Sequence, residues 1–272
     1  MTQLALLYEH PELPRFDLPS ELAEAYGGAL GFDRPRLFAN FVSTIDGVVA
    51  MPELAQSNKL ISDGSESDRF VMALLRALAD AVLIGAGTLR TTSRALWTAE
   101  RAYPDAADAF AELRRRLDKP AAPERVVITG SGSVPVSHPL FADGALVLTT
   151  ETGADRLDGR LPSASTIVSL GDSDTVDLHT AIAALRERGD ELILSEAGPR
   201  VFGSLLEARL VDELFLTVSP LIAGRGRSER LGFVEGFEAL PSKRLDGRLL
   251  SVRRDGGHLF LRYELVPSES RS

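Results

Sequence analysis

The stretch "VLIGAGTLR", residues 82–90, leads an apolar run into two glycines and a hydroxyl group. Gly85 and Gly87 carry no side chain, so a phosphate could approach the backbone closely, and Thr88 adds a hydroxyl at the start of the next helix. The residue types therefore suit phosphate binding. A lone GxG is also what a tight strand-to-helix turn needs, and taken alone it favours that simpler interpretation.

A second stretch, "LILSEAGPRVFGSLL" (residues 192–206), repeats this arrangement. Its apolar run delivers Glu196 and then Gly198, and Pro199 stands where a helix is expected to begin. The N–H groups that follow Pro199 have no partners within the helix and can bind an anion. Two such turns in one sheet could hold the two phosphates of a dinucleotide.

Polar side chains also end a third apolar run, "NFVSTIDGVVA" (residues 40–50), where Asn40 and Ser43 interrupt β-prone residues. An open α/β sheet usually binds its ligand at the carboxyl ends of its strands. We therefore expect this strand end to line a binding site. Asp46 and Gly47 are interpreted as the turn that holds the strand end in place.

The signatures of several other classes are missing. Neither glycine turn is a GxGxxG followed by an acidic strand end, which counts against a Rossmann dehydrogenase, and no GxxxxGK[ST], HExxH or GxSxG occurs. The chain has no cysteine, so disulfides, thiolate metal sites and a cysteine nucleophile are excluded. Its histidines, which lie far apart, are interpreted as surface or packing residues, and no metal site is predicted. These histidines are His10, His138, His179 and His258.

The composition is that of an ordinary globular protein of 272 residues, with 44% hydrophobic and 25% charged residues. Lys and Arg number 30 against 39 Asp and Glu, a net charge of −9, which argues against nucleic acid or an anionic membrane as the main partner and leaves a small molecule. The first residues show no basic region before an apolar run, and no run of about 18 apolar residues occurs. We expect a cytoplasmic protein.

From residue 36 onward, apolar strands alternate with helices, as in an α/β domain whose sheet is mainly parallel. The later stretches 212–220 and 249–265 are expected to be antiparallel, the latter as a hairpin that turns at Asp255-Gly256-Gly257. Strands are predicted over 36–44, 81–88, 125–130, 145–150, 165–170 and 191–199, and helices over 65–80, 105–118, 177–189 and 200–210.

The sequence divides into residues 1–35 as an N-terminal extension, 36–266 as one domain, and 267–272 as a tail. The extension should contain a short helix that Ser20 caps and Gly27-Gly28 stops. Within the domain, the basic run Arg114–Arg116 is interpreted as a solvated helix face. Asp212 and Glu213 are interpreted as packing or interface residues.

Three motifs together resemble a known family: "ANFVSTIDGVVA", "LLRALADAVLIGAGTLR" and "SEAGPRVFGSLLEARLVDELFLTVSPLIAGRG". They are similar to the reductase domain of the riboflavin-biosynthesis deaminase/reductase, and the resemblance runs from about Arg36 to Leu265. It implies a dihydrofolate-reductase-like α/β fold with a single mixed sheet, mostly parallel, helices on both faces and an antiparallel C-terminal edge. The zinc signature of the deaminase half requires cysteines, so the resemblance implies a stand-alone reductase.

The same resemblance implies an activity. NADPH would transfer a hydride to the ribose carbon of a ribosylaminopyrimidine phosphate, as in 5-amino-6-(5-phosphoribosylamino)uracil reductase, with the nicotinamide carrying the chemistry. A homodimer is also implied, with the antiparallel C-terminal edge as its contact.

Individual residues take roles from the resemblance. Glu196 would contact the substrate and is the candidate catalytic proton donor, since the reduction needs a proton; it could instead be a strand-end carboxylate that accepts backbone N–H groups. Arg76 matches the family's substrate arginine, and the alternative is a solvated helix arginine. The implied substrate contacts are Asn40, Ser43, Arg76, Leu96 and Glu196. The implied cofactor contacts are Val42, Gly85, Gly87, Thr88, Thr92, Thr129, Gly198, Pro199, Arg200, Val201, Phe202, Gly203 and Ser204.

One departure from the family leaves the substrate open. The family usually has Asp-Asp-Pro-x-Leu-Thr after the first glycine turn, whereas this chain has "RTTSRALWT", in which Thr91, Thr92 and Ser93 replace the acidic pair. Two alternatives follow. The protein could be a dihydrofolate or pterin reductase, which would need a carboxylate at the floor of the pocket, or an inactive NADPH-binding relative with a regulatory role.

Overall fold

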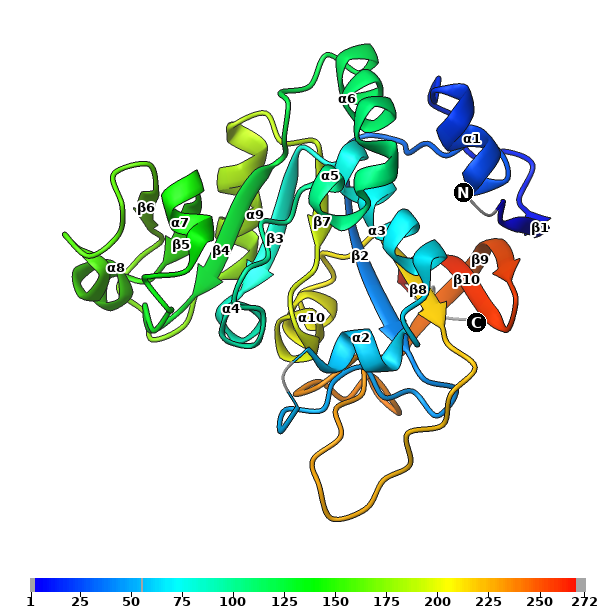
Figure 1. Ribbon diagram of the computed structural model, residues 1–272. Coiled ribbons are helices and arrows are strands. Elements are labelled where there is room, and N and C mark those ends of the chain that lie inside the picture. The colour runs from blue at the N-terminus through cyan, green and yellow to red at the C-terminus, as the bar shows by residue number, and fades with distance from the viewer. Residues whose placement is uncertain (1–2, 55, 268–272) are drawn as a thin grey trace.

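A computed structural model describes residues 3–54 and 56–267. The described residues form one ten-stranded sheet in the order β1-β9-β10-β8-β2-β7-β3-β4-β5-β6, with helices on both faces (Figure 1). The strands from β8 to β6 in this order run parallel to one another, and β10, β9 and β1 continue the sheet in antiparallel fashion. The predicted mixed, mostly parallel fold is confirmed. Within these residues, no helix is long and apolar enough to cross a membrane.

The predicted strands and helices of the alternating region are all present, most of them shorter than predicted, while β4 and α10 begin one residue earlier. The strands are β1 (Ala5–Glu9), β2 (Arg36–Ser43), β3 (Ala81–Gly85), β4 (Glu124–Thr129), β5 (Leu146–Thr149), β6 (Thr166–Ser169), β7 (Leu192–Ser195), β8 (Glu213–Val218), β9 (Leu245–Asp255) and β10 (His258–Pro267). The helices are α1 (Ser20–Tyr26), α2 (Ser57–Ile61), α3 (Glu66–Leu78), α4 (Ala86–Thr91), α5 (Ala99–Ala102), α6 (Ala107–Arg116), α7 (Pro139–Asp143), α8 (Glu151–Leu157), α9 (Leu178–Glu187) and α10 (Pro199–Glu207).

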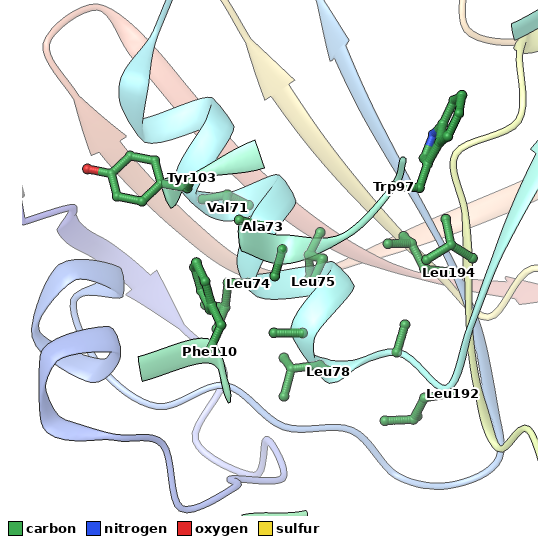
Figure 2. Packing of buried hydrophobic residues seen from close by; sticks show 14 of the residues in the cluster. Val71, Ala73, Leu74, Leu75, Leu78, Trp97, Tyr103, Phe110, Leu192 and Leu194 are labelled. Carbon is green, nitrogen blue, oxygen red and sulfur yellow. The ribbon is translucent and has the colours of Figure 1, made fainter. Parts of the chain in front are cut away.

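Helix α3 fixes one face of the sheet. The Ser65 side chain caps it by accepting from the N–H of Asp68 at 3.1 Å, and its apolar residues recur at helical spacing. Figure 2 shows Leu74, Leu75 and Leu78 between Phe110 of α6 and the strand residues of β7. Each such buried leucine contributes roughly 1.5–3 kcal/mol. The other face packs against α9 and α10.

Two details of the C-terminal part differ from the prediction. Strand β8, expected to be antiparallel, runs parallel to β2 and is antiparallel only to β10. The hairpin of β9 and β10 turns at Gly256-Gly257 as predicted. It does not form the sheet edge, however, because β1 pairs with the outer side of β9. The dimer contact expected at that hairpin would have to be made by β1 instead.

The N-terminal stretch is therefore continuous with the same sheet. Helix α1 starts after Pro19, and Ser20 is its first residue and not its cap, while Gly27 ends it with φ of 73° as expected. The buried Arg253 guanidinium holds the stretch to the sheet: its Nε donates to the Tyr26 carbonyl at 2.8 Å and its Nη2 to Glu9 at 2.6 Å. Sequence patterns do not show such a long-range contact.

The interpretation of Arg114 as solvated is wrong. This side chain is buried, and its Nη1 donates to the carbonyls of Ala77 at 3.0 Å and Ala79 at 2.8 Å, which end α3. Burial lowers the pKa of Arg114 to about 10. Arg115 and Arg116 are exposed as predicted. Asp212 accepts from the N–H of Leu37 at 2.7 Å, as a packing residue does.

Candidate active site

The polar strand ends gather at one edge of the sheet. In Figure 1, strands β2, β3 and β4 point toward the edge where α2, α4 and α10 lie. Because these strands are parallel, their carboxyl ends share this edge. The stretches that the sequence singles out at residues 40–50, 82–90 and 192–206 therefore meet there.

The two glycine turns lie side by side. A Cβ added to Gly198 would be 3.5 Å from the Thr88 hydroxyl oxygen, and one added to Gly85 would be 3.3 Å from the Val201 side chain and 3.8 Å from the Gly198 nitrogen. The backbone of the first turn thus touches the start of α10. Two phosphate-sized anionic groups could be held across this junction.

Packing requires glycine at some positions of the two turns and not at others. Gly85 packs closely against α10, and a Cβ on Gly203 would lie 2.2 Å from the Glu235 carbonyl oxygen, so packing explains both. Gly198 has φ of −66°, which any residue can adopt, and an added Cβ would meet only an ordinary contact. Gly87 is exposed within α4, where glycine costs roughly 0.8–1 kcal/mol relative to alanine. A ligand that approaches the backbone would explain Gly87 and Gly198.

The residues at the start of α10 also fall into two groups, those exposed at the site and those buried in the core. Gly198 is the N-cap and Pro199 the first residue, so the next N–H groups lie open at the helix start as predicted. Arg200 and Ser204 are exposed beside them. Phe202 is fully buried 4.8 Å from the Phe41 ring, so its side chain cannot contact a cofactor. Phe202 and Gly203 thus have packing roles, which sequence spacing along the helix start does not reveal.

Arg76 and Glu196, both expected to contact substrate, contact each other. The Arg76 Nε donates to Glu196 Oε1 at 2.7 Å and its Nη2 to Oε2 at 2.6 Å. The side chains are 8% and 10% exposed, so the solvated alternative for Arg76 is wrong. Arg76 Nη1 makes a longer contact of 3.5 Å to the Thr98 carbonyl. The guanidinium therefore hydrogen-bonds both carboxyl oxygens of Glu196 at the end of β7.

A second carboxyl group, Asp68, lies near this pair. Asp68 lies on α3, two helical turns before Arg76, and Met72 lies between them on the same face of the helix. The Met72 Sδ is 3.3 Å from Arg76 Nη2. The Asp68 carboxyl is half-buried and hydrogen-bonds the Thr217 hydroxyl of β8. Burial raises its pKa to about 6; the Glu196 charge adds to the rise, and Thr217 and His258 oppose it.

The end of β2 supplies the floor beneath α3. Asn40 is half-buried and lies opposite Phe215 in the pairing with β8; it lines a crevice of about 10 Å³ with Val71 and Thr217. Val42 pairs with Thr217 in the same register. Because side chains alternate along a strand, these two point to the α3 face, whereas Ser43 points to the other.

The hydrogen bonds of Asp46 confirm that it is a turn residue. Its carboxylate accepts from the Thr44 hydroxyl at 2.6 Å and from the N–H groups of Ala223 at 3.0 Å and Gly224 at 2.8 Å. These hydrogen bonds, led by that of Thr44, lower the Asp46 pKa to about 2. The carboxylate thus joins the loop after β2 to the loop after β8, and both loops border the site.

The remaining expected contacts lie around α4. Thr92 ends this helix and its hydroxyl donates to the Thr88 carbonyl at 2.6 Å, while Leu96 is half-buried in the following loop. Thr129 is buried at the end of β4, next to the strand that carries Gly85. His138, interpreted as a packing residue, contacts the Thr92 carbonyl at 2.6 Å.

Sequence reasoning missed Asp68, Thr217 and His258. An aspartate in the first turn of a helix is ordinary there, since it complements the helix dipole. The one available signal was its spacing of four and eight residues from Met72 and Arg76, which places all three on one face. Thr217 and His258 come near the site through β8 and β10, whose pairing the sequence did not specify.

The sheet order and the site at its carboxyl edge define an α/β protein of the dihydrofolate-reductase-like class. Residues 35–261 match the RibD C-terminal domain, and the chain belongs to that family. The resemblance predicted from three motifs is confirmed.

Individual proteins similar to this chain agree with the family match. The chain is 30% identical over 209 residues, 76% of its length and 88% of the relative, to a protein of Methanothermobacter thermautotrophicus named 2,5-diamino-6-ribosylamino-4(3H)-pyrimidinone 5′-phosphate reductase. A protein of that name from Archaeoglobus fulgidus is 25% identical over 193 residues, 70% of this chain and 83% of the relative. A pyrimidine reductase-like protein from Corynebacterium diphtheriae has a TM-score of 0.68 at 22% identity, covering 93% of this chain and 96% of that chain.

Proposed function

We propose that this protein is an NADPH-dependent reductase that acts on a ribosylaminopyrimidine 5′-phosphate in riboflavin biosynthesis. Membership of the RibD C-terminal domain family and the names of the curated relatives support the reaction class. Those names specify the 2,5-diamino pyrimidinone, whereas the motifs alone suggested the 5-amino uracil. The two compounds differ at ring carbon 2, and both are candidates.

The main support for a bound NADPH is the glycine at position 198. Neither its backbone conformation nor its neighbours require glycine, yet the position opens onto Thr88 and the free N–H groups at the start of α10. The pyrophosphate would be held by Gly87, Thr88 and residues Gly198 to Val201. Arg200 and Ser204 are exposed beside this position, and Thr129 lies further along the edge. NADPH, when bound, supplies the hydride.

The protein's own residues would orient the substrate on the α3 face. Arg76 and Glu196 form one unit there: the guanidinium can turn toward a sugar phosphate while Glu196 accepts from substrate hydroxyl or amino groups. Asn40 on β2 offers amide groups at the floor, and Leu96 borders the opening. Glu196 is only two residues before Gly198. The segment after β7 therefore links substrate and cofactor sites on opposite faces.

The direct test is turnover. Purified protein is mixed with NADPH or NADH and with the diamino pyrimidinone phosphate, the amino uracil phosphate or dihydrofolate, and loss of reduced nicotinamide is followed. We expect turnover with NADPH and a pyrimidine phosphate, giving a product with two added hydrogens. Deuterium from labelled NADPH should appear at the former ribose carbon 1. Stoichiometric NADPH binding with no turnover of any compound would favour the inactive relative instead.

A pterin reductase remains a second candidate because of Asp68. That alternative needs a carboxylate near the heterocycle, and the structure has one on the α3 face. Turnover of dihydrofolate with no turnover of either pyrimidine phosphate would replace the first proposal with this one.

We also propose a homodimer that forms through β1. This strand ends the sheet, and Leu6, Leu7 and Tyr8 are 47%, 54% and 43% exposed on it. An exposed apolar edge strand is a template for pairing with another chain. Light scattering at micromolar concentration should give the mass of a dimer, and Leu7→Lys should give that of a monomer.

A further inference from the structure

We propose that Asp68 is the proton donor of the reduction, a role that rests on the proposed function and that the motifs assign to no residue but Glu196. The two carboxyl groups lie on one face of the sheet, yet their surroundings differ. Both carboxyl oxygens of Glu196 already accept hydrogen bonds from Arg76. Asp68 instead hydrogen-bonds the neutral Thr217 hydroxyl.

The chemistry requires one proton for each hydride. The ribosylamine opens to an imine whose carbon 1 is doubly bonded to nitrogen; hydride adds to that carbon, the π electron pair moves to nitrogen, and nitrogen takes the proton. NADPH becomes NADP⁺, and the imine becomes a secondary amine. The donor becomes a carboxylate and recovers its proton from water. An acid whose pKa lies near the working pH performs this transfer best.

Position supports Asp68 as that acid. It lies in the first turn of α3, on the face that carries Met72 and Arg76 toward the ends of β2 and β7. The groups that face it come from three elements: Thr217 of β8, His258 of β10 and Glu196 after β7. Burial and the Glu196 charge raise the Asp68 pKa to about 6, while Thr217 and His258 lower it. A carboxyl group whose pKa is raised by burial and by a specific neighbouring group is a candidate functional acid.

The first test is Asp68→Asn, which keeps the shape and the hydrogen bond to Thr217. We expect kcat to fall about 100-fold or more, as loss of a general acid does, with the NADPH Kd unchanged. Asp68→Glu should recover part of the rate. Glu66→Gln, which removes an exposed carboxyl two residues away on the same helix turn, should leave kcat unchanged. Equal kcat for Asp68→Asn and Glu66→Gln would overturn the proposal.

The pH profile separates a donor from a residue that only maintains structure. The kcat of the unmodified protein should fall as pH rises above the Asp68 pKa, and Asp68→Asn should lose that dependence. The substrate phosphate also titrates near pH 6, so differences between variants carry the assignment. Thr217→Val removes a hydrogen bond that lowers the pKa, and it should move the alkaline limb to higher pH. An unmoved limb in Thr217→Val would count against Asp68.

Failure of the proposed function gives a different result. If the unmodified protein reduces no pyrimidine phosphate, the function itself is wrong and this role falls with it. If it reduces one, and Asp68→Asn keeps the rate and the profile, only the assignment of Asp68 is wrong.

Discussion

Two of the buried arginine–glutamate pairs on this sheet, Arg262–Glu213 and Arg76–Glu196, differ in the other partners of the arginine. Arg262 of β10 donates through Nε to Glu213 at 2.6 Å and through Nη2 to the Gly31 carbonyl at 2.8 Å. Its guanidinium also stacks 4.8 Å from the Phe32 ring centroid. Arg76, in contrast, has a sulfur atom at 3.3 Å and a weak contact to Thr98 beyond Glu196.

The environments of the two glutamates explain the difference. Glu213 lies among aromatic rings, and burial raises its pKa although Arg262 lowers it. Nothing about that pair requires a ligand, since the protein supplies its partners. Each glutamate has a second carboxyl group nearby: Glu264, which forms an ion pair with Arg248, lies near Glu213, and Asp68, which burial makes costly to ionise, lies near Glu196. Under the role proposed for Asp68, the protein sacrifices stability for function at this position.

Removing the Arg262–Glu213 pair should have the largest effect, and it should affect stability. Arg262→Ala leaves Glu213 buried with only the longer 3.6 Å contact from Arg36. We expect the free energy of unfolding to fall by about 3–5 kcal/mol, as for other broken buried pairs. Arg248→Ala breaks the Glu264 ion pair on the same hairpin, where Arg248 is 53% exposed, and should cost less than about 1 kcal/mol. Urea unfolding measures both, and equal losses would contradict the distinction.

Two glycines of α10 allow a similar comparison. Gly198 has room for a Cβ, whereas Gly203 is packed against the Glu235 backbone. Gly198→Val should raise the NADPH Kd by about 100-fold or more, roughly 2.7 kcal/mol, because its side chain obstructs phosphate approach. The thermal midpoint should fall less than that of Gly203→Ala, since an added Cβ at Gly198 meets only an ordinary contact. Gly203→Ala should lower the midpoint through its contact with Glu235 and leave the Kd of the folded fraction unchanged. Unchanged NADPH affinity in folded Gly198→Val would remove the cofactor from this position.

The sequence predicted those features that depend on local pattern. The period of α3, the glycine turns and the proline at the start of α10 each follow from a few neighbouring residues, and the structure has them all. The meeting of the turns followed as well, because parallel strands share an edge.

Contacts across the sheet could not be predicted in this way. Arg114 and Arg115 are neighbours of the same type, yet only Arg114 points to the end of α3. Arg76 and Glu196 are 120 residues apart, and their pairing depends on which strands adjoin. Asp68 becomes unusual through its burial and its neighbours Glu196, Thr217 and His258. The position of Thr217 depends on the parallel pairing of β8 with β2, the pairing that the sequence misassigned.

Opening the Arg76 pair should act on substrate more than on cofactor. We expect Arg76→Ala to raise the KM for the pyrimidine phosphate by roughly 10- to 100-fold, about 1.4–2.8 kcal/mol of binding, because it removes the arginine–phosphate contact. The NADPH Kd should change little. Some stability is also lost, since Glu196 is left buried without its partner. Arg69→Ala, an exposed arginine of the same helix, is the matched control. A wild-type KM in Arg76→Ala would disprove the assignment of that arginine.

The smallest expected effect concerns the stability cost of Asp68. Its folded-state pKa of about 6 lies above its ordinary value of 3.8, so the native state binds the proton more tightly than the unfolded chain. Stability from this group is therefore highest at low pH and is lost as pH rises from about 4 to above 6. A shift of roughly two pKa units corresponds to about 3 kcal/mol, and solvent near the half-buried carboxyl reduces this to about 1–2 kcal/mol.

Asp68→Asn should therefore be more stable than the unmodified protein at about pH 7, and most of the difference should be gone at about pH 4, where Asp68 is protonated in the native state and partly protonated in the unfolded chain. Urea unfolding of both proteins at the two pH values measures this, with Glu66→Gln as the control that shows no such change. The result is independent of any substrate. A difference that is the same at both pH values would mean that Asp68 ionises as an ordinary surface carboxyl, and its distinction from Glu213 and Glu196 would then rest on position alone.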